Sequence, residues 1–259
     1  MQIKILGCSG GIGDELRTTS MLVDGDILID AGTGVGDLSM DELLTIDHIF
    51  ITHSHLDHIA FIPFLLDTVM GFRDKPVTVH ASAETIATLR THIFNWKVWP
   101  DFNVIPDEAH ALLRYKELTL GETIHLGGRK ITALPANHVV PAIGYHLDSG
   151  ETSLVFTGDT TTCDALWREV NKIANLKYLI IETAFSNDEI ELAKLSKHLC
   201  PSLLVEELSK LSMENIRQSV EVYITHLKPG EGESIMQEIA ETHMTMPIQA
   251  LRKHQIFKL

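Results

Sequence analysis

Four side chains that commonly bind metal ions lie within six residues, in the stretch Thr52-His53-Ser54-His55-Leu56-Asp57-His58. Imidazole and carboxylate groups are good ligands for zinc and similar divalent ions, and four-coordinate sites are built from them. His53 and His55 alternate as in a strand, so both can point the same way. Asp57 and His58 are adjacent and cannot easily share that direction. The stretch therefore suits two neighbouring metal ions better than one.

The flanking sequence predicts which elements hold this cluster. Residues 46–51 are rich in apolar side chains and predict a buried strand, and residues 56–69 predict a buried helix. A cluster at the junction of a strand and a helix is held by a rigid framework, as a metal site requires. The alternative is a solvated turn that happens to be rich in histidine, which the two apolar flanks disfavour.

The pattern His53-x-His55-x-Asp57-His58 resembles the signature of the metallo-β-lactamase superfamily of metal-dependent hydrolases. The resemblance implies an α+β fold, a four-layer αββα sandwich with a two-metal site at one edge of its paired sheets. We expect residues 1–259 to form a single domain of this kind. The resemblance also implies three more ligands, and at strand ends further along the chain stand His138, Asp159 and His226.

The implied ligand set divides between two divalent metal ions. The first ion would be bound by His53, His55 and His138, the second by Asp57, His58 and His226, and both by Asp159. Two ions ~3.5–4 Å apart can hold a hydroxide between them, and a bound water whose pKa falls towards ~7 is a nucleophile at neutral pH. Zinc is the metal that we expect, with Mn²⁺ or Fe²⁺ as alternatives.

The rest of the chain alternates strands and helices. We expect strands at 2–6, within 19–30 as a hairpin, at 77–80, 142–147, 153–156, 178–181 and 220–224, with two more within 117–134, and helices at 82–95, 164–174, 188–197 and 202–212. The segments on either side of residue 135 are expected to form the two halves of the sandwich. Asp30, at the end of the hairpin, is either a support for a ligating histidine or a plain turn residue.

Two segments leave alternatives open. The turn Gly7-Cys8-Ser9-Gly10-Gly11 follows a predicted strand and could cradle phosphate, but it lacks a full phosphate-binding motif, so a tight turn near the site is an equal alternative. The aromatic segment Phe94–Phe102 could be a lid, a dimer contact or core packing, and core or interface is the favoured reading.

Composition limits the classes of partner. The formal net charge of −14 opposes non-specific binding to nucleic acid. The three cysteines are widely spaced and do not suggest disulfides, which fits a reducing compartment. The N-terminus lacks the apolar core of a signal peptide, and no apolar run approaches the ~20 residues of a membrane span. We therefore expect a cytoplasmic protein without membrane contact.

Later segments narrow the resemblance to one branch of the superfamily. Glu182-Thr183-Ala184-Phe185, Leu195-Ser196-Lys197-His198-Leu199 and Thr225-His226-Leu227-Lys228-Pro229 resemble the class II cyclic-nucleotide phosphodiesterases. The related RNase Z nucleases share an acid His and its carboxylate partner at the places of His198 and Glu182. Those nucleases usually have Gly where Leu56 stands and carry a protruding glycine- and lysine-rich arm, which we do not find in this sequence.

The resemblance implies hydrolysis of 3′,5′-cyclic AMP or GMP, a small-molecule substrate. His198, held by Glu182, would protonate the leaving sugar oxygen, and Asp57 counts as catalytic as well as ligating. The alternatives are an RNase Z-like tRNA 3′-processing endonuclease, a lactone, thioester or sulfate ester hydrolase, and a metal-stabilised binding module. Members of the branch are often dimers, and Trp96–Phe102 is a candidate surface for a homodimer.

Overall fold

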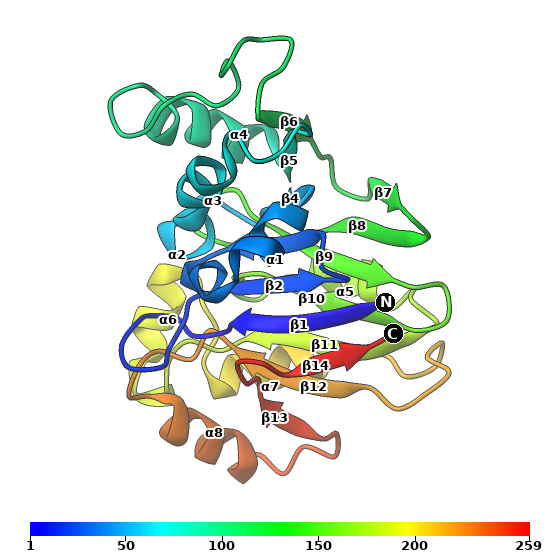
Figure 1. Ribbon diagram of the computed structural model, residues 1–259. Coiled ribbons are helices and arrows are strands. Elements are labelled where there is room, and N and C mark those ends of the chain that lie inside the picture. Colours follow the sequence, from blue (N-terminus) through cyan, green and yellow to red (C-terminus); the bar gives the residue numbers. More distant parts are fainter.

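The computed structural model describes all residues from 1 to 259, and they form two facing β-sheets with helices on the outer faces (Figure 1). Each sheet contains seven strands. The two ends of the chain lie side by side, and the amino group of Met1 donates a hydrogen bond to the carbonyl oxygen of Leu259. This layering confirms the αββα sandwich expected from the sequence.

The first sheet has the strand order β14-β1-β2-β3-β4-β5-β6. Its strands are β1 (Gln2–Gly7), β2 (Ser20–Val23), β3 (Ile27–Ala31), β4 (His48–Phe50), β5 (Val77–Ala81), β6 (Leu113–Glu117) and β14 (Ile256–Lys258). Strands β3 to β6 run parallel to one another. Their carboxyl ends therefore meet at one edge of the sheet.

The second sheet has the strand order β13-β12-β11-β10-β9-β8-β7. Its strands are β7 (Thr123–Leu126), β8 (Arg129–Pro135), β9 (Ile143–Asp148), β10 (Ser153–Phe156), β11 (Leu176–Glu182), β12 (Glu221–Thr225) and β13 (Ile248–Ala250). Strands β10 to β13 are parallel, and β9 is antiparallel to both β8 and β10. The carboxyl ends of β8, β10, β11 and β12 thus share an edge.

Eight helices connect these strands. They are α1 (Met40–Thr45), α2 (Leu56–Ile59), α3 (Phe61–Val69), α4 (Ala83–Thr88), α5 (Asp164–Val170), α6 (Ile190–Ser196), α7 (Pro201–Leu208) and α8 (Gly232–Glu241), with short helical turns η1 (Thr33–Asp37), η2 (Leu89–Ile93) and η3 (Asn187–Glu189). Pro201 stands at the start of α7, where its missing N–H costs no helical hydrogen bond. None of the helices combines the length and apolar character that crossing a bilayer requires.

Three apolar clusters separate the four layers. Along β3, Ile29 faces the second sheet, whereas Leu28 packs towards α3 on the opposite face. Along β10, Leu154 faces the first sheet and Val155 packs towards α5 and α7. This alternation follows from the two-residue period of a strand. The inner strands β2, β3 and β10 are buried on both faces, which explains their near-continuous apolar runs.

Two details differ from the sequence-based expectation. The chain passes from the first sheet to the second within residues 118–122, between β6 and β7, so the expected division at residue 135 is wrong. Strands β13 and β14 follow the segment expected to be the last strand, and β14 returns to pair with β1. Three-residue edge strands are too short to produce a readable alternation of apolar and polar residues.

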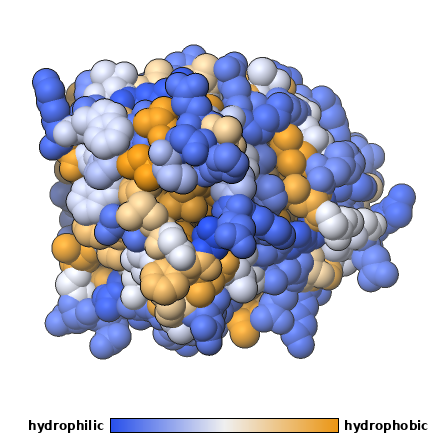
Figure 2. All heavy atoms as spheres, turned by 45° about the horizontal axis from the view of Figure 1, so that its top comes forward, coloured by the Kyte–Doolittle hydropathy of each residue, from blue (hydrophilic) through white to orange (hydrophobic).

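The aromatic segment Phe94–Phe102 divides between core and surface. Phe94 and Phe102 are buried in the cluster against the first sheet, whereas Trp96 is 63% exposed. Trp99 makes an edge contact with Phe64 of α3, with ring centroids 5.4 Å apart. Figure 2 brings the α4 and β6 end of the molecule forward and shows apolar patches among hydrophilic side chains on this face.

Candidate metal centre

The seven predicted metal ligands come together at the edge where the parallel strands end. They follow β4 (His53, His55, Asp57 and His58), β8 (His138), β10 (Asp159) and β12 (His226). Their potential ligand atoms form two groups, and within each group the atoms lie within 4.8 Å of one another. In Figure 1 this edge carries α2 and α6.

The first group contains three imidazoles, those of His53, His55 and His138. Nε2 of His53 lies 3.0 Å from Nδ1 of His55, and Nε2 of His138 lies 3.2 Å from the same atom. Burial lowers the pKa of His53 well below its ordinary value and that of His138 to about 4. At neutral pH these rings are therefore uncharged and can offer lone pairs to a metal ion.

The second group contains Asp57, His58, Asp159 and His226. Nε2 of His58 lies 3.3 Å from one Asp159 oxygen and 3.6 Å from an Asp57 oxygen. Nδ1 of His226 lies 3.4 Å from the other Asp159 oxygen. Asp159 also approaches Nε2 of His53 at 3.7 Å, so its carboxylate faces both groups. This is the position that a bridging ligand requires.

The residues of the second group fit a divalent cation. Nε2 of His58 and Nδ1 of His226 are buried and have no hydrogen-bond partner in the protein. Burial lowers the pKa of His226 to about 3, so that ring is neutral. Burial also opposes charge on His58, but Asp159 and Asp30 outweigh it and raise the pKa of His58 well above its ordinary value. The carboxylates thus favour a positive charge at this place, which a metal ion would supply.

Asp30 is in direct contact with His58. One of its oxygens accepts a hydrogen bond from Nδ1 of His58 at 2.7 Å, and both oxygens accept from Thr52, one from the backbone N–H and one from the hydroxyl. Asp30 is completely buried. It therefore fixes the ring of His58 with Nε2 turned towards the other carboxylates, which is the supporting role rather than that of a turn residue.

A backbone carbonyl orients His138. Nδ1 of His138 donates to the carbonyl oxygen of Lys197 at 3.0 Å, and the Lys197 ammonium donates back to the carbonyl oxygen of His138 at 3.1 Å. Lys197 ends α6 in the left-handed conformation, with φ of 53°. Side-chain patterns in the sequence give no sign of this role, because the group that accepts the hydrogen bond is a carbonyl oxygen.

The glycine-rich turn after β1 packs against the segment of His226. The Cys8 carbonyl accepts a hydrogen bond from the His226 N–H, and the Gly10 N–H donates to the Leu227 carbonyl. A Cβ at Gly10 would lie 2.6 Å from the His226 carbonyl oxygen. The turn thus packs closely against a predicted ligand, His226, which has a left-handed φ of 63°. Its role is close packing near the site, and its backbone is already engaged rather than open for a phosphate.

His198 and Glu182 form a buried pair beside the two groups. Nδ1 of His198 donates to Glu182 at 2.6 Å, and the carboxylate also accepts from the backbone N–H groups of Thr160 and Leu199. Burial opposes the imidazolium, but the Glu182 carboxylate outweighs it and raises the pKa of His198 above its ordinary value. His198 lies with His138 and Asp159 within 4.8 Å. It can therefore hold a proton close to the metal centre.

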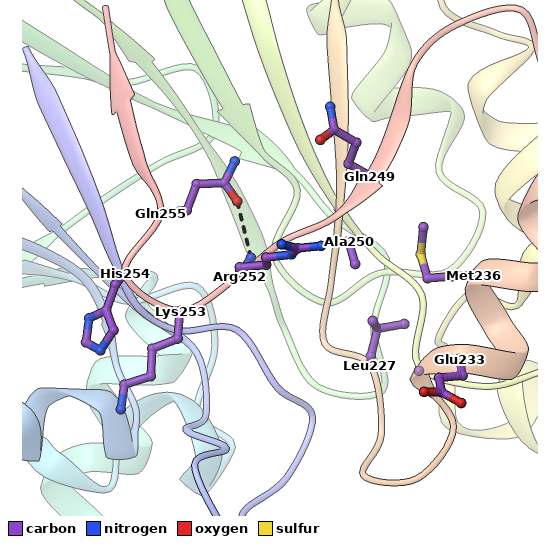
Figure 3. A pocket seen from close by; sticks show the side chains of 10 residues that line it. Leu227, Glu233, Met236, Gln249, Ala250, Arg252, Lys253, His254 and Gln255 are labelled. Atoms are coloured by element: carbon purple, nitrogen blue, oxygen red, sulfur yellow. Dashed lines mark hydrogen bonds between the residues drawn. The ribbon is translucent and has the colours of Figure 1, made fainter.

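One cavity lies apart from these residues. It has a volume of ≈ 920 Å³ and opens between α8, the edge strand β13 and the chain that leads into β14 (Figure 3). Leu227 and Met236 line one side and Arg252 and Gln255 the other, where the Gln255 side chain accepts a hydrogen bond from the Arg252 N–H. None of the seven predicted ligands lines this cavity.

Comparison with known proteins agrees with this architecture. The Beta-lactamase superfamily domain matches residues 26–252. A probable 3′,5′-cyclic-nucleotide phosphodiesterase of Yersinia pestis is 30% identical over 205 residues, which are 71% of this chain and 58% of that protein. A 3′,5′-cyclic-nucleotide phosphodiesterase of Aliivibrio fischeri is 27% identical over 271 residues, with 86% of this chain and 80% of that protein covered.

Among solved structures, unliganded yeast PDE1 has the same fold, with a TM-score of 0.82 and 20% identity, covering 100% of this chain and 99% of that one. At that identity the likeness concerns the fold alone. The family match covers most of the chain, and the two sheets with their helices fit the sandwich of these proteins. The chain therefore belongs to the family defined by the Beta-lactamase superfamily domain.

Proposed function

We propose that the chain is a metal-dependent phosphodiesterase that opens 3′,5′-cyclic nucleotides at a two-metal site. The observation that carries this proposal is that one buried carboxylate, that of Asp159, faces both ligand groups, with the His198–Glu182 pair beside them. The names of the Yersinia and Aliivibrio relatives support the choice of substrate.

In this proposal the two ligand groups would hold one ion each. His53, His55 and His138 would hold one, Asp57, His58 and His226 the other, and Asp159 would contact both. When bound, divalent ions supply Lewis-acid polarisation of the phosphoryl group and a water nucleophile at neutral pH. Zn²⁺ is the ion that this set of imidazoles and carboxylates suits best.

His198 would supply the proton for the leaving group. Its Nδ1–H is committed to Glu182, so the second proton of the imidazolium sits on Nε2. In hydrolysis a bond forms between phosphorus and the water oxygen, and the bond to the 3′ oxygen breaks. Nε2 of His198 delivers its proton to the 3′ oxygen, and the attacking water releases one proton to solvent. The product is the 5′-monophosphate. A positioned general acid is typically worth about 10²–10⁴-fold in rate.

Glu182 would position this acid and stabilise its charge. Its two oxygens accept from His198, Thr160 and Leu199, so the carboxylate cannot rotate away. Because Leu199 follows His198 directly, one carboxylate fixes both the ring and the adjacent backbone. Glu182 thus holds the imidazole in a single tautomer and orientation.

The test is product analysis. Zinc-loaded protein is incubated with 3′,5′-cyclic AMP and with cyclic GMP, and the products are identified by phosphorus NMR, with the Asp159→Ala variant alongside. We expect the 5′-monophosphates from the wild type and none from Asp159→Ala. Hydrolysis of bis-p-nitrophenyl phosphate without opening of either cyclic nucleotide would reject the proposed substrate. Inactivity on all phosphodiesters, with turnover of a lactone, thioester or sulfate ester, would reject phosphodiesterase chemistry.

A further inference from the structure

A second cavity adjoins the metal centre. It has a volume of ≈ 710 Å³ and meets the centre at His138. Its walls come from the residues that follow β5 (82–84), from the end of β6 and the residues after it (117–120), and from the loop between β8 and β9 (136–143). Its size is that of a pocket for one small organic molecule. A substrate whose phosphate lies at the metal centre could extend its organic part into this cavity.

The lining combines apolar walls with two free carboxylates. Leu118 and Leu120 contribute apolar surface on one side, and Val139 and Val140 on the other. The neutral polar side chains are already engaged: Ser82 donates to Thr85, Thr119 to Glu122, and Asn137 both donates to Thr162 and accepts from Lys197. Among the lining side chains, the exposed carboxylates of Glu84 and Glu117 are the charged groups that have no partner in the protein.

Neither carboxylate has a partner in the protein. Glu84 and Glu117 make no side-chain hydrogen bond and no salt bridge, and no lysine or arginine lines the cavity. An ionised carboxylate only accepts hydrogen bonds, so a ligand in this cavity must present N–H or O–H donors. A second phosphate would be repelled, because binding of a nucleic-acid backbone depends on cationic side chains. The cavity thus suits a single uncharged, donor-bearing group.

We propose that this cavity receives the base of the nucleotide and prefers guanine to adenine. The inference rests on the proposed function, since it takes the phosphate to lie at the metal centre. Guanine presents two adjacent donors, N1–H and the 2-amino group, and can pair with a carboxylate through both. Adenine presents one amino group next to the lone pair of N1, which a carboxylate repels. Sites that hydrogen-bond a ligand group discriminate against analogues that lack it.

The test compares two bases in the same protein. Dissociation constants of 5′-GMP and 5′-AMP are measured by calorimetry on zinc-loaded wild type, Glu84→Gln, Glu117→Gln and the double variant. Glu151→Gln is the matched control, because Glu151 is exposed in the turn between β9 and β10, at the opposite end of these strands. The ratio of the two dissociation constants measures the base preference, because a general effect of charge on anion binding cancels in it.

We expect 5′-GMP to bind about tenfold tighter than 5′-AMP in the wild type and in Glu151→Gln, the effect of a hydrogen bond to a charged group that remains partly solvated. The ratio should fall towards one in the double variant. A wild-type ratio near one, or a ratio that survives the double substitution, would overturn the inference.

The outcome for the proposed function is read separately, from the opening of cyclic GMP and cyclic AMP. If the protein opens cyclic nucleotides with a base preference that the variants do not change, the cavity is rejected as the base site and the proposed activity stands. A preference for 5′-GMP that depends on the two glutamates, without any opening, would keep the cavity and reject the activity. Absence of both binding and opening rejects both, and tighter binding of RNA than of a mononucleotide rejects the cavity as a mononucleotide site.

Discussion

Histidine rings contact one another in two places in the protein, and carboxylates bond to the rings in only one of them. In the first sheet, Nδ1 of His48 lies 3.0 Å from Nε2 of His80, whose ring stacks on Phe50 with centroids 4.2 Å apart. At the metal centre, His58 lies between Asp30, Asp57 and Asp159. His80 and His58 are both buried, whereas His48 is half-buried.

Burial has a similar effect on the pKa of a histidine in both places. It lowers the pKa of His80 to about 3, as it does for His226. Each place also contains a buried ring nitrogen without a hydrogen-bond partner, Nδ1 of His80 and Nε2 of His58. What distinguishes the metal centre is that its lone pairs converge with carboxylates on the same point. A buried, neutral histidine is therefore weak evidence for a metal site, and convergence is strong evidence.

The largest effect is expected at His198, which has a carboxylate partner but is assigned to proton transfer rather than to a metal ion. His198→Ala should lower kcat/KM for cyclic nucleotides by about 10²–10⁴-fold, because an alkoxide leaving group needs a proton. The loss should be much smaller for bis-p-nitrophenyl phosphate, whose leaving group is stable as an anion. Steady-state kinetics on both substrates measures the difference.

Two further observations make this prediction specific. His198→Ala should keep the metal content of the wild type, which separates an acid from a ligand. His80→Phe is the control at the other histidine place and should leave both rates unchanged. Equal losses on the two substrates would contradict a general-acid role for His198.

A smaller effect is expected where the carboxylate acts through a ligand. Asp30→Asn should weaken metal binding by about 10–100-fold, the typical cost of removing an outer hydrogen-bond partner of a ligating histidine. Competition with a chromophoric chelator gives the affinity directly. Asp67→Asn, an exposed carboxylate on α3, is the control and should bind as the wild type does. An unchanged affinity in Asp30→Asn would show that His58 does not depend on this support.

The smallest expected effect concerns His80 and its contribution to the pH dependence of the free energy of unfolding. The pKa of His80 is about 3 in the folded protein and about 6.5 when unfolded. The unfolded chain therefore takes up a proton first, and stability falls as the pH drops from about 6.5 towards about 3. At pH 5 the loss is about 2 kcal/mol for this one group.

His80→Phe should remove that part of the pH dependence while keeping a ring against Phe50. Urea unfolding at pH 7 and pH 5, in the presence of a chelator, compares the variant with the wild type. Because the buried histidines of the metal centre are common to both proteins, the difference reports on His80 and its contact with His48. An identical drop in both proteins would mean that His80 does not resist protonation as its burial implies.

Some of the predicted ligands can be recognised from a local sequence pattern and others cannot, for physical reasons. His53, His55, Asp57 and His58 are visible in the sequence because they stand within six residues at the junction of two apolar elements. His138, Asp159 and His226 are each single residues after a strand, and only the resemblance to a family marked them. Contacts across the fold bring them together, and no local pattern encodes those contacts.

Supporting groups were harder to predict than ligands. The carbonyl of Lys197 holds His138, and the carbonyl of Cys8 holds the backbone of His226, yet main-chain groups leave no trace in a list of side chains. The two roles left open for the glycine-rich turn were separated only by the close approach of Gly10 to His226. The layers of the fold were predicted, but the three-residue strands β13 and β14 were not.

The measurement that tests the central claim most directly is the metal content per chain after dialysis against zinc, determined by mass spectrometry of the metal, for wild type, His80→Phe and Asp159→Asn. The account predicts two ions per chain in the wild type and in His80→Phe, and a loss in Asp159→Asn because one carboxylate serves both ligand groups. Equal metal content in Asp159→Asn and the wild type, or a loss in His80→Phe, would contradict it.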